Sequence, residues 1–142
     1  MGKLDCFESL FRVFDYDVFK GANGVEYVLT KDKVLTGGVI DITVDDKTQF
    51  EAVHNHEHIG IIVKKRTFYR VVHIMDCAAR MLFKQLNKDF PNRIFYVFST
   101  IELGETPTIR FHQKWSGEYP YYRALYCKKD RKAIICYNND QM

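Results

Sequence analysis

The chain has 142 residues and a formal net charge of +3, from 21 lysines and arginines against 18 aspartates and glutamates. This length is near the commonest size of a single domain, and a composition that is 46% hydrophobic and 15% aromatic supplies enough apolar side chains for one core. No stretch is long and apolar enough to span a bilayer, and the N-terminus lacks the pattern of a signal peptide. We therefore expect one soluble, cytoplasmic domain of residues 1–142.

Two further features of the composition bear on partners and metals. Acids outnumber bases before residue 58 and bases outnumber acids from residue 64 onward, which favours oriented association with a partner. A net charge of +3 is still smaller than a duplex-binding domain usually carries, so a nucleic-acid partner is less expected than a protein. Cys6, Cys77, Cys127 and Cys136 form no C-x-x-C pair, so reduced thiols are expected rather than a zinc ribbon.

The N-terminal part of the chain predicts a short helix followed by strands. Apolar residues recur at helical spacing from Leu4 to Phe14. The runs Val18–Lys20 and Val25–Thr30 flank residues 21–24, where Asn-Gly readily takes the positive φ of a tight turn, so a hairpin is expected. A further strand is expected at Val39–Val44, where apolar and polar residues alternate.

Residues 48–58 fit two different structures. Phe50 and Val53, with acidic residues before them, suit one or two helical turns, whereas the alternation from Phe50 to His58 suits a strand. Both alternatives stay open at this point. The apolar run Ile59–Val63 that follows is expected to be a strand leading into the next helix.

A long amphipathic helix is predicted from Thr67 to Phe90, and the rest of the chain is organised around it. The Thr67 hydroxyl is expected to cap the first free amides, and Pro91 disfavours helical geometry in the residue before it. The apolar side chains recur at steps of three and four on one face: Val71, Ile74, Met75, Ala78, Leu82, Leu86 and Phe90. The opposite face could contact acidic protein or phosphate, although such faces are more often only solvated: Arg70, His73, Arg80, Lys84, Asn87 and Lys88.

Four consecutive strands are predicted after this helix: Arg93–Leu103, Thr108–Trp115, Tyr121–Lys128 and Ala133–Tyr137. The first is apolar on both faces, which is typical of a central strand, and the second alternates cleanly. Because strands cluster in runs, the fold class is α+β: a mostly antiparallel sheet, made of N-terminal hairpin strands and a four-strand C-terminal meander, packed on one long central helix.

The histidine cluster at residues 54–58 is a candidate metal site. On a strand, His54, His56 and His58 would all point to one face, and H-x-H on a strand can supply two metal ligands. On a helix, only His54 and His58 would share a face. A solvated loop is the commoner role of such a string.

The late strands carry a candidate partner-binding surface. Basic and aromatic side chains are interleaved there: Arg110, His112, Lys114, Tyr119, Tyr121, Tyr122 and Arg123. Tyrosine and arginine are enriched at protein–protein hot spots, and such side chains on an open sheet can also stack bases and follow a phosphate backbone. Covering an edge of the core is the alternative role of the tyrosines.

No P-loop, Gly-x-Ser-x-Gly string or Rossmann glycine pattern is present, so no catalytic residue and no cofactor beyond a metal ion is assigned. We expect a non-enzymatic protein-binding domain, of the class that includes the immunity proteins that inhibit bacterial toxins. A charge of +3 disfavours an inhibitor of basic nucleases, which should be acidic. The alternatives are a small metal-dependent enzyme built on the histidine cluster and a single-stranded nucleic-acid-binding domain.

Overall fold

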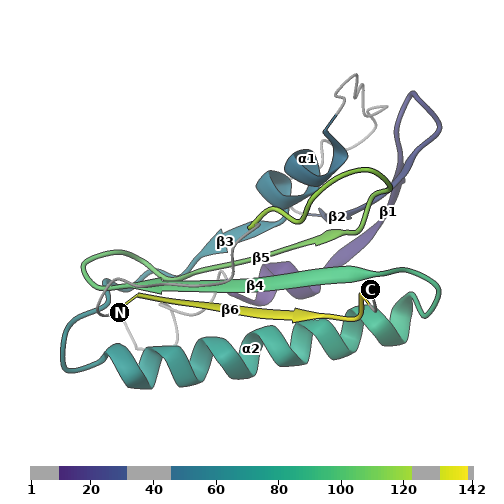
Figure 1. Ribbon diagram of the computed structural model, residues 1–142. Helices are drawn as coiled ribbons and strands as arrows, with labels where there is room; N and C mark the ends of the chain where they lie inside the picture. Colours follow the sequence, from purple (N-terminus) through teal and green to yellow (C-terminus); the bar gives the residue numbers. More distant parts are fainter. Residues whose placement is uncertain (1–9, 32–45, 123–131, 141–142) are drawn as a thin grey trace.

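The computed structural model describes residues 10–31, 46–122 and 132–140 and has the α+β fold that the sequence predicts (Figure 1). Its elements follow in the order β1 (Tyr16–Lys20), β2 (Glu26–Thr30), α1 (Lys47–His54), β3 (His56–His58), α2 (Phe68–Asp89), β4 (Phe95–Glu102), β5 (Thr108–Gln113) and β6 (Lys132–Asn138). The strands β1 and β2 form an antiparallel hairpin, and the other four form an antiparallel sheet in the order β3-β5-β4-β6. Neither of the described helices combines the length and the apolarity that crossing a bilayer needs.

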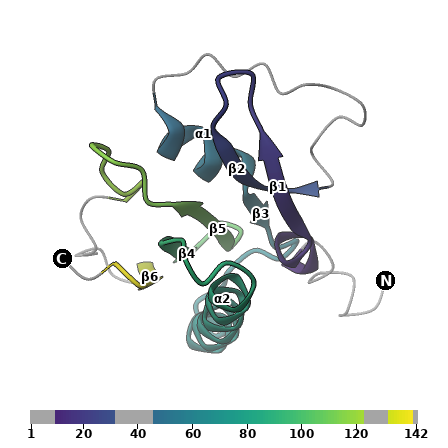
Figure 2. The ribbon, with the colours of Figure 1, turned by 90° about the vertical axis from the view of Figure 1, so that its right-hand side faces the viewer.

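The four-stranded sheet lies between two helices of very different length (Figures 1 and 2). On one face α2 runs along the sheet and packs on β4 and β6, whereas α1 lies on the other side, next to the hairpin. The strand β4 lies between β5 and β6, which confirms that the first strand after the long helix is a central strand. The fourth strand of this sheet is β3, which precedes α2 in the chain.

The predicted Thr67–Phe90 helix is present, and its buried residues follow the predicted apolar stripe. They pack against the inner side chains of β4 and β5 to form the main core. The predicted cap is wrong, because the Thr67 hydroxyl accepts no hydrogen bond from a backbone amide of the first turn of α2. Its backbone is already helical (φ −106°, ψ −5°) rather than extended, so its hydroxyl turns back and accepts from Lys64 N at 3.1 Å.

Residues 48–58 contain a helix and a strand in succession, so each alternative describes one part. The helix α1 ends at His54, Asn55 is its C-cap, and β3 begins at His56. The N-terminus of α1 is capped by its own Asp46, whose carboxylate accepts from Gln49 N at 2.9 Å.

The strand predicted at Ile59–Val63 is wrong. This stretch has no strand geometry and runs along the turn between β4 and β5, where it makes only separate hydrogen bonds. Ile59 N donates to Pro107 O at 2.8 Å and Val63 N donates to Glu105 O at 2.9 Å. Since a turn offers its carbonyls at isolated points, no ladder can form along it.

The predicted N-terminal hairpin is confirmed, with the strands β1 and β2 paired from Tyr16 with Thr30 to Lys20 with Glu26. Gly24 takes the expected positive φ of 83°, and its amide donates to Gly21 O at 2.9 Å. Before the hairpin, residues 10–14 form a 3₁₀ turn, and the rest of the helix predicted there lies outside the described residues.

Other predicted features also fall outside the described residues. These are the strand at Val39–Val44, residues 123–128 of the strand Tyr121–Lys128, and the cysteines at positions 6 and 127. The described end of that last strand, Tyr121 and Tyr122, is a bend. Cys77 and Cys136 form no disulfide among the described residues and are half-buried.

The hairpin is joined to the sheet through one fully buried carboxylate, that of Glu51 in α1. One oxygen accepts from Gln113 N and from the Trp115 indole, both at 2.8 Å. The other accepts from Val28 N at 2.9 Å and from the Gln113 side-chain amide at 2.8 Å. Burial raises the pKa of the Glu51 carboxyl to about 7, and the four donated hydrogen bonds act in the opposite direction. Since every partner is a donor, the arrangement suits the carboxylate form.

Asn55 makes a second link, one helical turn further along the chain. Its side-chain oxygen accepts from Thr30 N at 3.0 Å, and its amide donates to Val28 O at 2.8 Å, so it pairs with β2 as a neighbouring strand would. Its backbone carbonyl accepts from Phe111 N of β5 at 3.2 Å. Together Glu51 and Asn55 satisfy backbone groups of both β2 and β5, which a buried boundary between two sheets requires.

We expect Glu51→Gln to lower the free energy of unfolding by about 2–4 kcal/mol, because the new amide would face buried donors. Urea denaturation followed by the fluorescence of Trp115, which is the single tryptophan of the chain, measures this. The matched control is Glu105→Gln at an exposed turn position, which should change stability by no more than about 0.5 kcal/mol. Equal stability of the two variants would contradict the role given to Glu51.

Candidate functional site

The predicted aromatic and basic residues lie on the face of the sheet opposite α2 and in the loop that follows β5. Along β5, Ile109 and Phe111 belong to the core with α2, whereas Arg110 and His112 point to the other face. The alternation predicted for this strand is therefore present. Arg123 lies outside the described residues.

His112 is an internal support of this face and is only 1% exposed. Its ring stacks on Tyr96, with the ring centroids 5.4 Å apart. Its Nδ1 lies 2.7 Å from Gln113 O, and its Nε2 accepts from Tyr121 N at 3.1 Å, so the imidazole is neutral and carries its proton on Nδ1. Burial lowers the pKa of His112 to about 4, and the nearby Arg110 acts in the same direction. Both ring nitrogens are engaged inside the protein.

Arg110 and two tyrosines form a cluster that is closed on itself. The guanidinium carbon lies 4.5 Å from the ring centroid of Tyr121 and 5.9 Å from that of Tyr122. Arg110 Nη1 donates to Ala52 O, in the last turn of α1, at 3.0 Å, where a positive charge is favourable. The ring of Tyr122 in turn meets that of Phe98 edge to face, with the centroids 4.9 Å apart. This cluster connects the sheet to α1 and to Tyr121 and Tyr122.

Lys114 forms an ion pair with Asp140 at 2.8 Å, beyond the end of β5. The Tyr96 hydroxyl donates to the other oxygen of Asp140. The hydrogen bond from Lys114, followed by that from Tyr96, lowers the pKa of the Asp140 carboxyl. This pair joins the end of β5 to the segment after β6.

The loop of residues 115–121, here called the 115–121 loop, is fixed at both ends. At its start, the Trp115 indole donates to Glu51, and the ring packs against Tyr27 of the hairpin with the centroids 5.5 Å apart. At its end, Tyr121 is held by its amide on His112 and by its ring under Arg110.

A third attachment lies in the middle of the loop and caps α1. The Glu118 carboxylate accepts from Thr48 N at 2.7 Å and from Lys47 N at 3.3 Å, where negative charge is favoured by the helix dipole. The Lys47 ammonium lies 3.9 Å from the same carboxylate. Gly117 provides the turn before it with a φ of 78°, and Glu118 N donates to Trp115 O at 3.1 Å.

Between these attachments Tyr119 is 68% exposed, next to Pro120, and the loop lines two neighbouring cavities. The larger, of about 440 Å³, is lined by Asp46, Thr48, Gln49, Gly117, Glu118, Tyr119, Pro120 and Tyr121. The second, of about 390 Å³, is lined by Thr48, Tyr96, His112, Lys114, Trp115, Gly117, Glu118, Tyr119, Pro120 and Asp140. Tyr119 therefore lines both cavities.

The three clustered histidines are divided between two elements. His56 and His58 share a face of β3, and their ring centroids are 5.2 Å apart, whereas His54 ends α1 with its Nε2 3.2 Å from Thr30 O. His58 Nδ1 lies 2.9 Å from the Thr108 hydroxyl. Among the described residues no three His, Cys, Asp or Glu side chains are grouped as a metal ion would require. The metal site stays a prediction without support from this geometry.

The residues that fix the candidate site are largely ones that the sequence did not single out. The buried contacts of the loop depend on Glu51, Trp115, Glu118 and Asp140. A sequence signal exists for one of them, since Trp115 is the single tryptophan of the chain and a buried indole N–H usually finds a hydrogen-bond acceptor. Nothing in the spacing of Glu118 or Asp140 indicates which backbone or side chain each one meets.

No protein-family model, curated protein or solved structure matches this chain.

We expect the titration of His112 to make the protein less stable as the pH falls from about 6.5 to about 4. The unfolded state takes up a proton below the ordinary pKa of 6.5, whereas the folded state resists protonation until about 4. His112→Phe keeps an aromatic ring against Tyr96 and removes this contribution. Between about pH 4 and 6.5, the stability difference between wild type and variant should rise by about 3 kcal/mol.

Urea denaturation at several pH values measures this difference. The raised pKa of Glu51 makes stability fall as the pH rises from about 4.5 to about 7, which opposes the effect of His112. Since both proteins contain Glu51, its contribution cancels in the comparison. A difference that does not change with pH would mean that His112 titrates normally.

Proposed function

We propose that this chain is a single, non-enzymatic protein-binding domain that recognises its partner through the 115–121 loop, with Tyr119 as the central contact. The observation that carries this proposal is the exposure of Tyr119 on a loop that hydrogen bonds hold at its start, middle and end. Tyrosine is among the residues that contribute most to protein–protein binding energy.

The attachments of the loop favour binding because they limit the freedom that is lost on association. Ordering a flexible side chain at an interface costs about 0.5–1.5 kcal/mol. Here Trp115, Glu118 and Tyr121 already hold the loop through hydrogen bonds to Glu51, α1 and His112. A tyrosine adds large contact area with only two rotatable side-chain bonds. The loop is thus prepared to bind without rearrangement.

The two cavities indicate which side chains the partner would offer. The larger is lined by two carboxylates, Asp46 and Glu118, and by polar side chains of α1, so it suits a polar or basic group. The second contains the rings of Tyr96 and Trp115 beside the Lys114–Asp140 ion pair, so it suits an apolar group with a polar end. A protein surface can supply both groups next to Tyr119.

We assign this binding to the cytoplasm and to the inhibition of a toxin by an immunity-type mechanism. Covering an active site of another protein requires only a rigid, self-contained surface, and the 115–121 loop supplies one. The described residues offer no grouped metal ligands, and both nitrogens of the buried His112 are engaged, so a binding role fits this geometry better than a catalytic one.

We expect Tyr119→Ala to weaken partner binding by about 2 kcal/mol, or roughly thirtyfold in Kd. The tagged protein would first capture its partner from extracts of its own host, and the affinity would then be measured with the two purified proteins. The control is Tyr69→Ala on α2, which removes a tyrosine that is 81% exposed on the other side of the sheet and should change Kd by less than about twofold.

A captured toxin would arrest growth when expressed alone, and co-expression of the wild-type chain, but not of the Tyr119→Ala variant, would restore growth. Equal losses from Tyr119→Ala and Tyr69→Ala would place the contact elsewhere. Failure to capture any partner at micromolar concentration would count against the binding role itself.

A further inference from the structure

The exposed face of α2 carries a straight row of basic side chains, here called the α2 basic row. Five of its members lie on α2 at steps of three, four or seven residues, so they share one face of the helix, and Arg66 continues the row in the turn before α2. All of them are exposed, and they lie opposite the buried stripe that packs on the sheet: Arg66, Arg70, His73, Arg80, Lys84 and Lys88. A helix of 22 residues is about 33 Å long, so the row covers most of one edge of the molecule.

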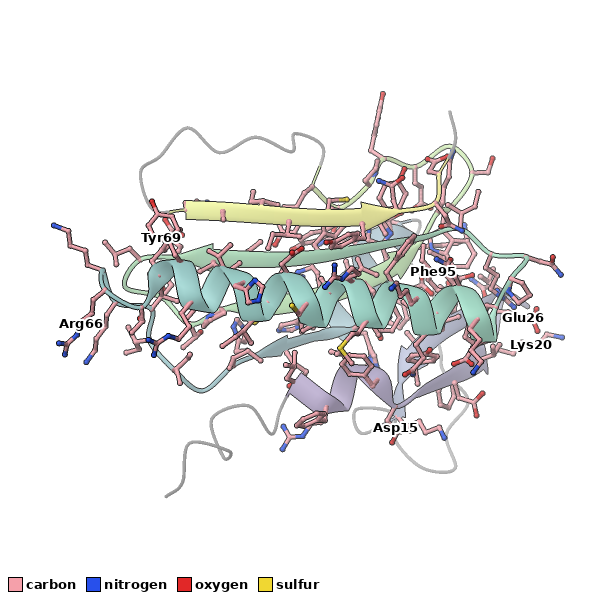
Figure 3. All side chains as sticks on the ribbon, turned by 90° about the horizontal axis from the view of Figure 1, so that it is seen from below. Asp15, Lys20, Glu26, Arg66, Tyr69 and Phe95 are labelled. Atoms are coloured by element: carbon pink, nitrogen blue, oxygen red, sulfur yellow. The ribbon has the colours of Figure 1, made fainter. Side chains whose placement is uncertain are left out.

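Figure 3 looks onto this side of the molecule, with α2 in front of the sheet and Arg66 extending from one end. Lys20 and Glu26 of the hairpin lie at the opposite end. The row therefore faces away from the 115–121 loop, which lies next to α1 on the other side of the sheet. The two surfaces can bind different partners.

The positive charge of the row is not balanced by neighbouring acids. Residues 64–90 contain seven lysines and arginines but only two acids, Asp76 and Asp89. Each of these carboxylates accepts a hydrogen bond from a tyrosine hydroxyl, Asp76 from Tyr137 and Asp89 from Tyr16. Within the described residues, no salt bridge involves a member of the row.

The composition of the row favours a phosphate polymer over other anionic partners. Cys77 is the one side chain of helical spacing within the row that carries no basic group, and the exposed Tyr69 and Met81 of α2 flank the row rather than interrupt it. A membrane surface would need an apolar face to insert, and the apolar face of α2 is buried against the sheet. Three of the six members are arginines, whose planar guanidinium matches phosphate in a bidentate manner.

We propose that the α2 basic row binds the phosphate backbone of duplex nucleic acid without reading its sequence. The length of α2, about 33 Å, is close to the roughly 34 Å of one turn of duplex DNA. Contacts of this kind release counterions, so the affinity should be in the micromolar range and should fall steeply with salt. The net charge of +3 does not indicate this basic surface, because most of the acids that balance its charge lie in other parts of the chain.

The test uses the full chain and a fluorescein-labelled duplex of about 20 base pairs, with binding followed by fluorescence anisotropy. Wild-type affinity should fall roughly a hundredfold between about 50 and about 200 mM salt. The double variant Arg80→Gln/Lys84→Gln should reduce the slope of log K against log salt by about 2, since each neutralised contact contributes about 1. Both positions are exposed, and circular dichroism checks that the variant is folded.

The matched control is Lys20→Gln/Lys31→Gln on the hairpin, which lowers the formal charge by the same two units. It should leave the salt slope within about 0.5 of wild type. An equal effect of the two double variants, or no measurable binding at about 50 mM salt, would overturn the proposal. Tighter binding of polyglutamate or of phosphatidylserine vesicles than of the duplex would overturn the assignment to nucleic acid.

Discussion

The fold depends on one buried carboxyl group, that of Glu51. The Glu51 carboxylate lies at the boundary between the β1–β2 hairpin and the four-stranded sheet, where two strand edges meet without a ladder between them. A strand edge buried without partners would leave amides unsatisfied, at a cost of about 1–3 kcal/mol for each one. One carboxylate accepts four hydrogen bonds there, and Asn55 supplies the next pair of contacts along β2. The short helix α1 therefore joins the hairpin to the four-stranded sheet through buried polar side chains.

The same buried contacts of α1 also position the proposed binding surface. The same Glu51 that holds the hairpin also holds Trp115, and Glu118 returns to cap the other end of α1. The exposed side chain of Tyr119 is thus presented by a loop whose fixed points are buried hydrogen bonds. The affinity for a partner at Tyr119 therefore depends on Glu51. If the hydrogen bonds of Glu51 were lost, the 115–121 loop would become mobile, and the entropy lost in ordering it would weaken binding.

The parts of the fold that sequence reasoning predicted correctly are those that obey an apolar period. The long helix, the hairpin and the alternation of β5 follow steps of 3.6 or 2 in hydrophobic residues. The helix α1 does not, because its buried positions at helical spacing are mostly polar: Thr48, Glu51, Ala52 and Asn55. A hydrophobic pattern cannot predict such a helix. Its buried polar side chains are satisfied by hydrogen bonds to β2 and β5, which are distant in the sequence.

The same limitation applies to the predicted surface residues. From the sequence, Arg110, His112 and Lys114 are grouped as side chains available to a partner, yet each one is used inside the protein. Arg110 contacts Tyr121 and the last turn of α1, and His112 accepts from the amide at the end of the 115–121 loop. Lys114 forms an ion pair with Asp140. By contrast, no salt bridge among the described residues involves the basic row of α2, and the two acids of this helix accept hydrogen bonds from tyrosine hydroxyls. Whether a charge is free to bind a partner therefore depends on contacts between distant segments. Its periodicity shows only which face of an element it occupies.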